Sequence, residues 1–393
     1  MRKGREYMLK KKVLVIIPDR FEKASGGMGT NSAPVFERLS SDYEFYVVGF
    51  PLEGTSVPSF VAAYRAVSSF YTETKFGPLD TLLAQARYVA EALKFPKPDL
   101  VYAYDWSIYQ AAVEVADFFK VPLVARMCLS PILLGEQGQT FGLNLEIAAE
   151  KAIHNALCEM EIRGLKRADR VVHISRGYRA QYEKFFSFAK KIRLVENGID
   201  LAEWRGEIEP YFLPGGIGRK KIIFLGRLTE VKGVLSLCKA RVPKEIDLIF
   251  IGPRNSADLL CMRAIEQTVE KENNVYFLGA LYGQDKIRAV RAADALIVSS
   301  QHEPFGTVGL EGLAAGCVVL SSRVGGLADY LNNETSIFCG TQPEEIEAAY
   351  HSLLILSKRN QDSMRTAGFE ICRTYTTESS ARKLDASFRE LLS

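Results

Sequence analysis

The sequence predicts an α/β protein with two doubly wound domains, each built on a parallel sheet. The first observation is length, because 393 residues exceed what one hydrophobic core usually supports. The second is composition, since 47% apolar and 25% charged residues are ordinary for a soluble globular enzyme. The third is the alternation of short apolar runs with longer helical patterns, which is typical of parallel α/β units.

The first predicted domain covers residues 1–205, and its sheet is expected from six apolar runs. In chain order these runs are KVLVII, YEFYVVGF, DLVYAY, PLVARM, RVVHIS and IRLVENG. The first run follows a basic leader and is interrupted at Pro18, so we interpret it as a buried strand rather than a signal peptide. No apolar run reaches the length that spans a bilayer. His173, inside the fifth run, is expected to be a core histidine with its hydrogen bonds satisfied.

The second predicted domain covers residues 206–375 and begins at the linker-like segment EPYFLPGGIGRK. Its runs are KIIFLG, IDLIFIG, NVYFLG, ADALIVSS, CVVLSS and TSIFCG. Ligands of such sheets bind outside the carboxyl ends of the strands, so a cleft between the two domains is the expected site.

Charge and cysteine content narrow the function classes. A formal net charge of +3 is too small to indicate a nucleic-acid partner. The seven cysteines show no metal-ligand spacing, so we interpret them as reduced thiols of a cytoplasmic protein and expect no metal. The oligomeric state stays open.

One stretch, SSQHEPFGTVGLEGLAAGCVVLSS, carries the strongest functional pattern. ADALIVSS is read as a strand, QHEPFG as the loop at its carboxyl end and TVGLEGLAAG as the following helix. The backbone amides of Phe305, Gly306 and Thr307 would then lie at a helix amino terminus, where unpaired N–H groups and the helix dipole favour a phosphate. Gly306 lets that backbone approach the ligand closely.

Two glutamates flank this helix start. Glu303 lies in the loop, and Glu311 lies four residues after Thr307 and therefore on the same helical face. Carboxylates beside a bound phosphate are better suited to accept hydrogen bonds from sugar hydroxyls. A nucleotide sugar has this layout, with ribose on one side of a diphosphate and a hexose on the other. The alternative is that both glutamates are merely solvated surface residues.

The stretch EPFGTVGLEGLAAG resembles the E-x7-E signature of retaining glycosyltransferases of the GT-B fold. The wider pattern is similar to glycogen and starch synthases, and the resemblance covers nearly the whole chain. FLGRLTEVKG resembles the donor-diphosphate motif, with Arg227 and Lys232 at its basic positions, and RVGGLADYL places Asp329 at an acidic position. PDLVYAYDW, ADRVVHISRGY, LVENGID and EKASGGMGT match segments of the amino-terminal half.

The resemblance implies two Rossmann-like domains with an interdomain cleft, and a carboxyl-terminal helix over residues 376–393 that returns to the first domain. Arg227 and Lys232 would stabilise the charge of the departing diphosphate. From the first domain, Lys23, Gly26 and Gly27 would approach the same diphosphate, although an exposed lysine is an equal alternative for Lys23. The nucleobase would meet backbone groups around Gly279 and Leu281.

The acceptor side is expected at the end of DLVYAY. Tyr102, Tyr104 and Trp106 are either stacking platforms for a glucan or core residues, and Asp105 either orients an acceptor hydroxyl or caps a helix. Family members often carry histidines where this chain has Tyr104 and Cys128. A histidine that contributes through its backbone carbonyl tolerates such a change, whereas one that contributes through its side chain does not.

The function expected from this resemblance is retaining transfer of a hexose, with glucose favoured, from a nucleoside diphosphate to an α-1,4-glucan. The reaction would proceed on one face of the sugar without a protein nucleophile, and no cofactor is expected. Two alternatives stay open: transfer to a small acceptor such as a disaccharide precursor, sugar phosphate or glycolipid, and a binding protein that has lost catalysis. The nucleobase is not fixed by the sequence.

Overall fold

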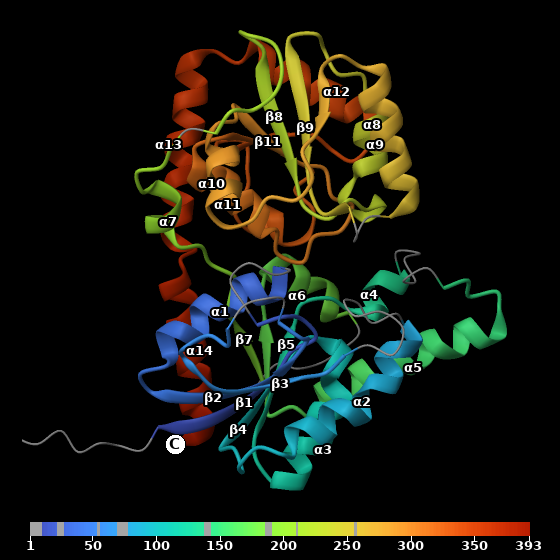
Figure 1. The fold of residues 1–393 in the computed structure, drawn as a ribbon, viewed down its shortest axis with the longest axis vertical. Helices are drawn as coiled ribbons and strands as arrows, with labels where there is room; N and C mark the ends of the chain where they lie inside the picture. The colour runs from blue at the N-terminus through green and yellow to red at the C-terminus, as the bar shows by residue number, and fades with distance from the viewer. Residues whose placement is uncertain are drawn as a thin grey trace, which may run out of the picture. The chain divides into compact units, whose positions relative to one another are not determined.

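The computed structural model describes residues 10–21, 27–52, 56–68, 78–136, 143–184, 191–209, 211–254 and 258–393. The chain divides into two compact units (Figure 1). The first comprises Met1–Ile174, Arg179–Val195 and Ser380–Ser393, and the second comprises Ser175–Tyr178 and Glu196–Ser379. Each unit contains one parallel sheet with helices on it, so the predicted α/β class with two parallel sheets is confirmed.

The sheet of the first unit has seven described strands in the order β3-β2-β1-β4-β5-β6-β7, and all neighbours pair in parallel. The strands are β1 (Lys11–Ile16), β2 (Tyr43–Gly49), β3 (Val61–Ala66), β4 (Leu100–Tyr104), β5 (Leu123–Met127), β6 (Arg170–His173) and β7 (Ile192–Leu194). All six expected runs form strands, and β3 is an edge strand that the sequence pattern did not predict.

Helices cover both faces of this sheet. They are α1 (Gly27–Leu39), α2 (Pro78–Ala92), η1 (Trp106–Ile108), α3 (Tyr109–Phe119), α4 (Pro131–Glu136), α5 (Ala148–Arg167), α6 (Arg176–Tyr182, shared between the two units) and α14 (Thr377–Leu392). Helices α2, α3 and α5 contact one another on one side of the sheet, and α1 and α14 lie on the other (Figure 1). Strand residues alternate between these two faces, which places Tyr102 and Tyr104 on the α14 side.

Helix α14 is tied into the first unit by apolar and polar contacts. The Phe388 ring lies 5.4 Å from the ring of Tyr43 and 5.7 Å from that of Tyr102, measured between centroids. The Tyr43 hydroxyl donates to Asp385 Oδ1 at 2.8 Å. Leu384 is buried in the same cluster, so the last helix of the chain completes the core of the first unit.

The sheet of the second unit has six described strands in the order β10-β9-β8-β11-β12-β13, again all parallel. They are β8 (Lys220–Leu225), β9 (Ile246–Ile251), β10 (Val275–Phe277), β11 (Ala295–Val298), β12 (Val318–Ser321) and β13 (Ser336–Phe338). The chain proceeds from β8 to one edge and then continues from β11 to the other edge. This reversal creates a switch point at the carboxyl ends of β8 and β11, where α/β sheets bind ligands.

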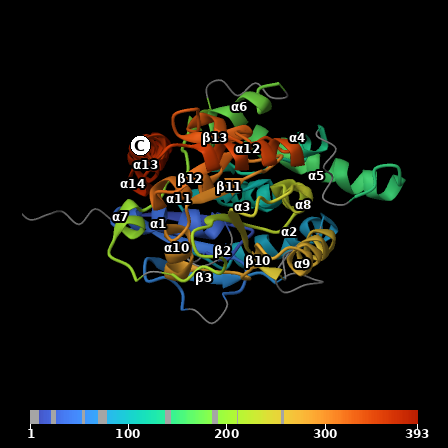
Figure 2. The same cartoon turned by 90° about the horizontal axis from the view of Figure 1, so that it is seen from above.

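The helices of the second unit lie on both faces of its sheet. They are α7 (Leu201–Arg205), η2 (Glu230–Lys232), α8 (Val234–Lys239), α9 (Leu259–Lys271), α10 (Gly283–Arg291), α11 (Thr307–Ala315), η4 (Gly325–Asp329), α12 (Pro343–Ile355) and α13 (Lys358–Thr374). Figure 2 shows α9 beside β10 and α12 beside β13, at opposite edges of the sheet. Among the described residues, no helix combines the length and the apolar character that crossing a bilayer requires.

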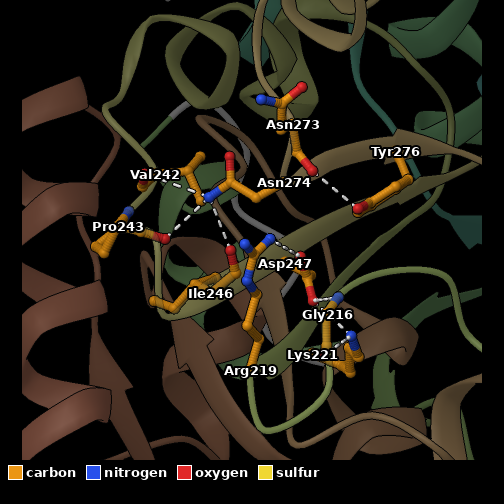
Figure 3. Close-up of polar contacts among 10 residues, drawn as sticks. All are labelled: Gly216, Arg219, Lys221, Val242, Pro243, Ile246, Asp247, Asn273, Asn274 and Tyr276. Carbon is orange, nitrogen blue, oxygen red and sulfur yellow. Dashed lines mark hydrogen bonds and ion pairs between the residues drawn. The ribbon is translucent and has the colours of Figure 1, made fainter.

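A buried carboxylate anchors the segment that leads into the second sheet (Figure 3). Asp247 in β9 is fully buried and accepts hydrogen bonds from Gly216 N at 3.0 Å and Arg219 Nη1 at 3.2 Å. Lys221 Nζ forms an ion pair with the same carboxylate. Nearby, the Asn274 side chain donates to carbonyls of the turn before β9. These groups lie at the amino ends of the strands, so their role is structural.

Candidate functional site

The carboxyl ends of β8 and β11 carry an ion pair that we call the loop pair, formed by Lys232 and Glu303. Lys232 ends η2 after β8, and Glu303 lies in the loop between β11 and α11. The Ser300 hydroxyl donates to Glu303 Oε2 at 3.2 Å, and the Ser299 hydroxyl donates to the Lys232 carbonyl at 3.3 Å. Glu303 is 8% exposed. The two loops therefore hold one carboxylate and one ammonium together in a nearly buried position.

Two glycines allow this arrangement. Gly233 has φ 80°, and a Cβ there would lie 2.2 Å from the Ser299 carbonyl oxygen, so a side chain would push the two loops apart. Gly306 has φ 87°, and a Cβ there would lie 2.2 Å from the Leu327 side chain. Both positions combine a left-handed backbone with a close approach, which only glycine satisfies without strain.

Aromatic rings pack against the loop that leads into the amino terminus of α11. Phe305 is buried, with its ring centroid 5.7 Å from that of Tyr330 and 5.9 Å from that of Tyr375. The Tyr330 hydroxyl donates to the Gly306 carbonyl. No side chain among the described residues caps this helix start, although Thr307 Oγ1 accepts from Asn197 at 3.3 Å. The Phe305 side chain thus supports the loop, and only its backbone can serve a ligand.

A second pair, which we call the helix pair, lies one turn along α11. Lys286 Nζ donates to Glu311 Oε1 at 2.7 Å, and the two side chains are 19% and 12% exposed. Lys286 comes from the first turn of α10, and its ammonium lies 5.6 Å from the ring centroid of the buried Trp204. Sequence reasoning missed Lys286, because no spacing or motif links it to Glu311.

The other residues that were predicted for the donor side have different surroundings from one another. The Arg227 side chain is exposed and forms no ion pair with another described residue. Gly279 has φ 75° with open space at its Cβ position, and Leu281 is partly buried against the core of the second unit. Gly27 begins α1. Lys23 and Gly26 lie outside the described residues.

Two further groups surround the β11–α11 loop. The Asp329 carboxylate accepts from Arg176 N at 2.6 Å and Gly177 N at 2.9 Å, at the start of α6. His302 directly precedes Glu303 and is buried, and its ring centroid lies 5.4 Å from that of Tyr178. Burial lowers the pKa of His302 to about 4, so this histidine is neutral at physiological pH.

The aromatic residues predicted for the acceptor side are buried. Tyr102, Tyr104 and Trp106 are at most 5% exposed, and both tyrosines belong to the core of the first unit. The structure therefore favours the core alternative over stacking platforms, because neither face of a buried ring is available to a sugar. Cys128 follows β5 and packs against the same core, and burial raises the pKa of its thiol to about 12.

Asp105 occupies a strained position at the end of β4. Its φ of 96° is rare for a residue other than glycine, and its Oδ1 accepts from Leu129 N at 3.1 Å. Asp105 directly precedes η1, and the Trp106 and Cys128 amides also hydrogen-bond to its carboxylate. Burial raises the Asp105 pKa to about 7. Strain of this kind clusters at functional sites, which fits a role for this carboxyl group.

A buried carboxyl group that the sequence did not indicate lies next to the loop after β5. Glu161 of α5 is fully buried and accepts from the Ser130 hydroxyl at 2.9 Å and from the Tyr182 hydroxyl. Tyr182 Oη also lies 3.3 Å from the Leu129 carbonyl. Burial raises the Glu161 pKa to about 8. Its signal in the sequence was weak, since a glutamate in a helix is usually exposed.

His173 differs from its expectation in one respect. It is fully buried in β6, as expected of a core histidine, but neither ring nitrogen has a hydrogen-bond partner among the described residues. Burial lowers its pKa to about 3, so the ring is neutral.

Comparison with known proteins places this geometry in a family. Residues 215–368 match the family described as "Glycosyl transferases group 1", and residues 27–198 match a "Glycosyl transferase 4-like domain". The second unit carries a group 1 glycosyltransferase domain. The group 1 match includes the loop pair and the helix pair, and the 4-like match covers most of the first unit.

A relative and two solved structures are similar to this chain. This glycosyltransferase is 28% identical to a glycogen synthase of Mycobacterium tuberculosis over 267 residues, which are 66% of this chain and 60% of the relative. Sucrose-phosphate synthase from Thermosynechococcus elongatus has a similar fold, with a TM-score of 0.82, 18% identity, and coverage of 97% of this chain and 99% of that one. HepE from Anabaena, solved with UDP-glucose, has a TM-score of 0.72, 16% identity, and coverage of 97% and 100%. These likenesses establish the GT-B fold.

Proposed function

We propose that this glycosyltransferase transfers a hexose, with glucose favoured, from a nucleoside diphosphate to an acceptor hydroxyl with retention of configuration. The observation that carries the proposal is the pair of Lys–Glu contacts on the two sides of the α11 start. A nucleotide sugar bound there would place its diphosphate at the amides of residues 305–307. Its hexose would meet Glu303, and its ribose would meet Glu311.

The charges support an anionic ligand at this position. Two carboxylates near a phosphate would repel it, but each is balanced by a lysine ammonium in contact with it. Arg227 adds a cation that is not engaged in an ion pair with a described residue. The net charge of these five side chains is therefore positive, which favours a diphosphate and its increasing charge as the bond to the sugar breaks.

The proposed mechanism assigns each residue a role. Arg227 and Lys232 stabilise the leaving diphosphate, and Glu303 holds hexose hydroxyls. The departing phosphate accepts the proton of the acceptor hydroxyl on the same face of the sugar, so no protein nucleophile is required. Lys232 contacts Glu303 in the ligand-free protein and would bridge this carboxylate to the diphosphate when the donor binds. HepE, which shares the fold, binds UDP-glucose, and this supports the donor class.

The acceptor has two candidates. The glycogen synthase relative supports an α-1,4-glucan, with Asp105 orienting its hydroxyl and Tyr104, Trp106 and Cys128 on the acceptor side. The burial of Tyr102 and Tyr104 favours a small acceptor instead, because a glucan groove needs exposed rings and these two are in the core. Sucrose-phosphate synthase, which is named for a small phosphorylated product, shares the fold.

One experiment tests donor and acceptor together. The full chain is incubated with UDP-glucose or ADP-glucose and, in parallel, with a malto-oligosaccharide, a hexose phosphate or inositol phosphate. A ladder of lengthened oligosaccharides would support the glucan, and a single new product from a phosphorylated acceptor would support the small-acceptor candidate. Binding of the donor without transfer to any acceptor and without donor hydrolysis would reject catalysis.

A further inference from the structure

Lys286 is a partly buried cation outside the motifs that define the donor site. Its side chain is 19% exposed, and its ammonium has two neighbours of defined chemistry: Glu311 Oε1 at 2.7 Å and the ring of Trp204 at 5.6 Å from the centroid. A lysine amid solvent adopts many rotamers, whereas these two contacts fix the direction of this one. Through these two contacts, the Lys286 side chain connects the helices α10, α7 and α11 in a defined geometry.

The contact leaves half of the Glu311 carboxylate available. Lys286 engages Oε1, and Oε2 accepts no hydrogen bond from any residue that the structure describes. A carboxylate offers about four lone-pair positions, so a carboxylate held at one oxygen can still accept two hydroxyl donors at the other. The Glu311 side chain is 12% exposed, so a ligand can reach it over only a small part of its surface.

We infer that Lys286 is the positioning residue for the ribose end of the donor: it holds Glu311 so that Oε2 faces the ribose hydroxyls. This inference rests on the proposed function, in which Glu311 binds ribose. Lys286 also neutralises the carboxylate, which lowers the repulsion between Glu311 and the adjacent diphosphate. The consequence is specificity, because a fixed carboxylate offers its free oxygen in one direction and loses charge-assisted hydrogen bonds when the ribose hydroxyls are absent.

The discriminating measurement is the ratio of two affinities. Calorimetry with the full chain compares UDP and ADP with their 2′,3′-dideoxy analogues, which lack both hydroxyls. We expect the wild-type chain to prefer the ribonucleotide of at least one base by about 10-fold or more, as for a hydrogen bond to a charged group. Lys286→Met keeps an apolar stem against Trp204 but removes the charge, and should reduce the preference to about 3-fold or less. Lys286→Arg should retain most of it.

Matched controls separate positioning from general effects. Lys271 is 82% exposed in α9, and its Nζ lies 3.7 Å from Glu272, so Lys271→Met removes the same charge from the same unit without touching the helix pair. This variant should keep the wild-type ratio. The affinity ratio is measured on one preparation, so a fraction of unfolded protein changes the apparent stoichiometry and leaves the ratio intact. Lys286→Gln serves in place of Lys286→Met if the latter does not fold.

The outcomes distinguish this inference from the proposed function. If Glu311→Gln abolishes the ribose preference but Lys286→Met keeps it, the positioning role is overturned and the donor site stands. If the wild-type chain binds neither nucleotide, or if Glu311→Gln leaves the ratio unchanged, both are overturned. The third variant combines Lys286→Met with Glu311→Gln. If its preference for the ribonucleotide is no lower than that of Glu311→Gln alone, Lys286 acts through Glu311.

Discussion

At the scale of single residues, the loop pair means that two residues of the proposed donor site already contact each other in the protein without ligand. Lys232 and Glu303 are both largely buried and in contact, whereas Arg227 is exposed without an ion pair to a described residue. The two cations that the sequence assigned to the same diphosphate therefore have different roles in the ligand-free protein. Removing Lys232 leaves a buried carboxylate without its partner, and removing Arg227 does not.

This difference gives the first prediction. Arg227→Ala and Lys232→Ala should each lower donor affinity or turnover by about 10- to 150-fold, because each loses a charge-assisted hydrogen bond to the diphosphate. Only Lys232→Ala should also lower the free energy of unfolding of the second unit. Donor titration and urea unfolding of the same preparations measure both effects. Wild-type turnover in both variants would reject the diphosphate assignment.

The second prediction separates the two glutamates. Glu311→Gln should weaken binding of the free nucleoside diphosphate and of the nucleotide sugar alike, because both contain ribose. Glu303→Gln should spare the free nucleoside diphosphate and reduce transfer, because only the sugar meets this carboxylate. Calorimetry with both ligands on both variants decides the question, and the opposite order of effects would exclude this division of roles.

The sequence predicted these carboxylates and could not predict their lysines. Glu303 and Glu311 share one short stretch, so local spacing places them at one helix start. Lys286 and Glu311 are 25 positions apart, and only the packing of α10 against α11 brings them together. The buried rings of Tyr102 and Tyr104 could not be assigned either, since alternation along a strand leaves the choice of face open.

At the scale of elements, the loop after β5 is held by a polar network rather than by regular structure. Asp105 accepts from its Leu129 amide, and Glu161 accepts from Ser130 and Tyr182. The pKa of Asp105 is raised to about 7 and that of Glu161 to about 8, in both cases by burial. Both carboxyls are therefore wholly or partly protonated near neutral pH.

The third prediction is a pH dependence of stability. Unfolded carboxyls titrate near pH 4, so between about pH 4 and 8 the folded chain holds protons that the unfolded chain has lost. The free energy of unfolding should therefore fall as pH rises through this range. The neutral His173 and His302 act in the opposite sense, because the unfolded imidazole, half protonated at about pH 6.5, binds a proton that the folded ring does not. Their effect is small above that pH, so between pH 6.5 and 8 the effect of the carboxyls is the larger one.

Urea unfolding at pH 6.5 and pH 8 tests this prediction. In Glu161→Gln the decrease in unfolding free energy across the range should be smaller than in the wild-type chain, since one of the two protons is no longer lost. Glu159→Gln changes an exposed glutamate in the same helix and should retain the wild-type decrease. An equal decrease in Glu161→Gln would show that this carboxyl is ionised throughout.

The strands show which elements could be predicted. Runs such as KIIFLG and IDLIFIG are mainly apolar, and each forms a strand whose central residues are buried on both faces. β3 has the sequence VAAYRA, and most of its residues are partly or fully exposed. An edge strand with one neighbour buries too little for a clear apolar pattern, which explains why it was missed. The interdomain cleft stays a prediction.

At the scale of the whole molecule, the last helix belongs to the first unit, but the segment just before it packs in the second unit. Leu384 and Phe388 are buried against β1, β2 and β4, whereas Tyr375, just before α14, stacks with Phe305 and Tyr330 in the second unit. The chain turns between the helices α13 and α14, so residues on the two sides of this turn contribute to different cores.

The fourth prediction concerns this helix. Deletion of the residues after Thr376 should destabilise the first unit, because it exposes the apolar surface that Leu384 and Phe388 cover. Phe388→Ala alone should cost about 3–5 kcal/mol, the usual range for a buried phenylalanine. Hydrogen exchange of β1, β2 and β4 measures the loss, and the strands of the second unit serve as an internal control. Unchanged protection of the first sheet would refute the prediction.

The placement of α14 also sets an order of events during synthesis. A ribosome releases residues 380–393 only after every residue of the second unit, Glu196–Ser379, has emerged. At about 5–20 residues per second, the first sheet waits on the order of ten seconds or more with its α14 surface uncovered. The unit encoded second is therefore the first that can be completed, and the nascent amino-terminal half presents an apolar surface that chaperones can bind until the final helix arrives.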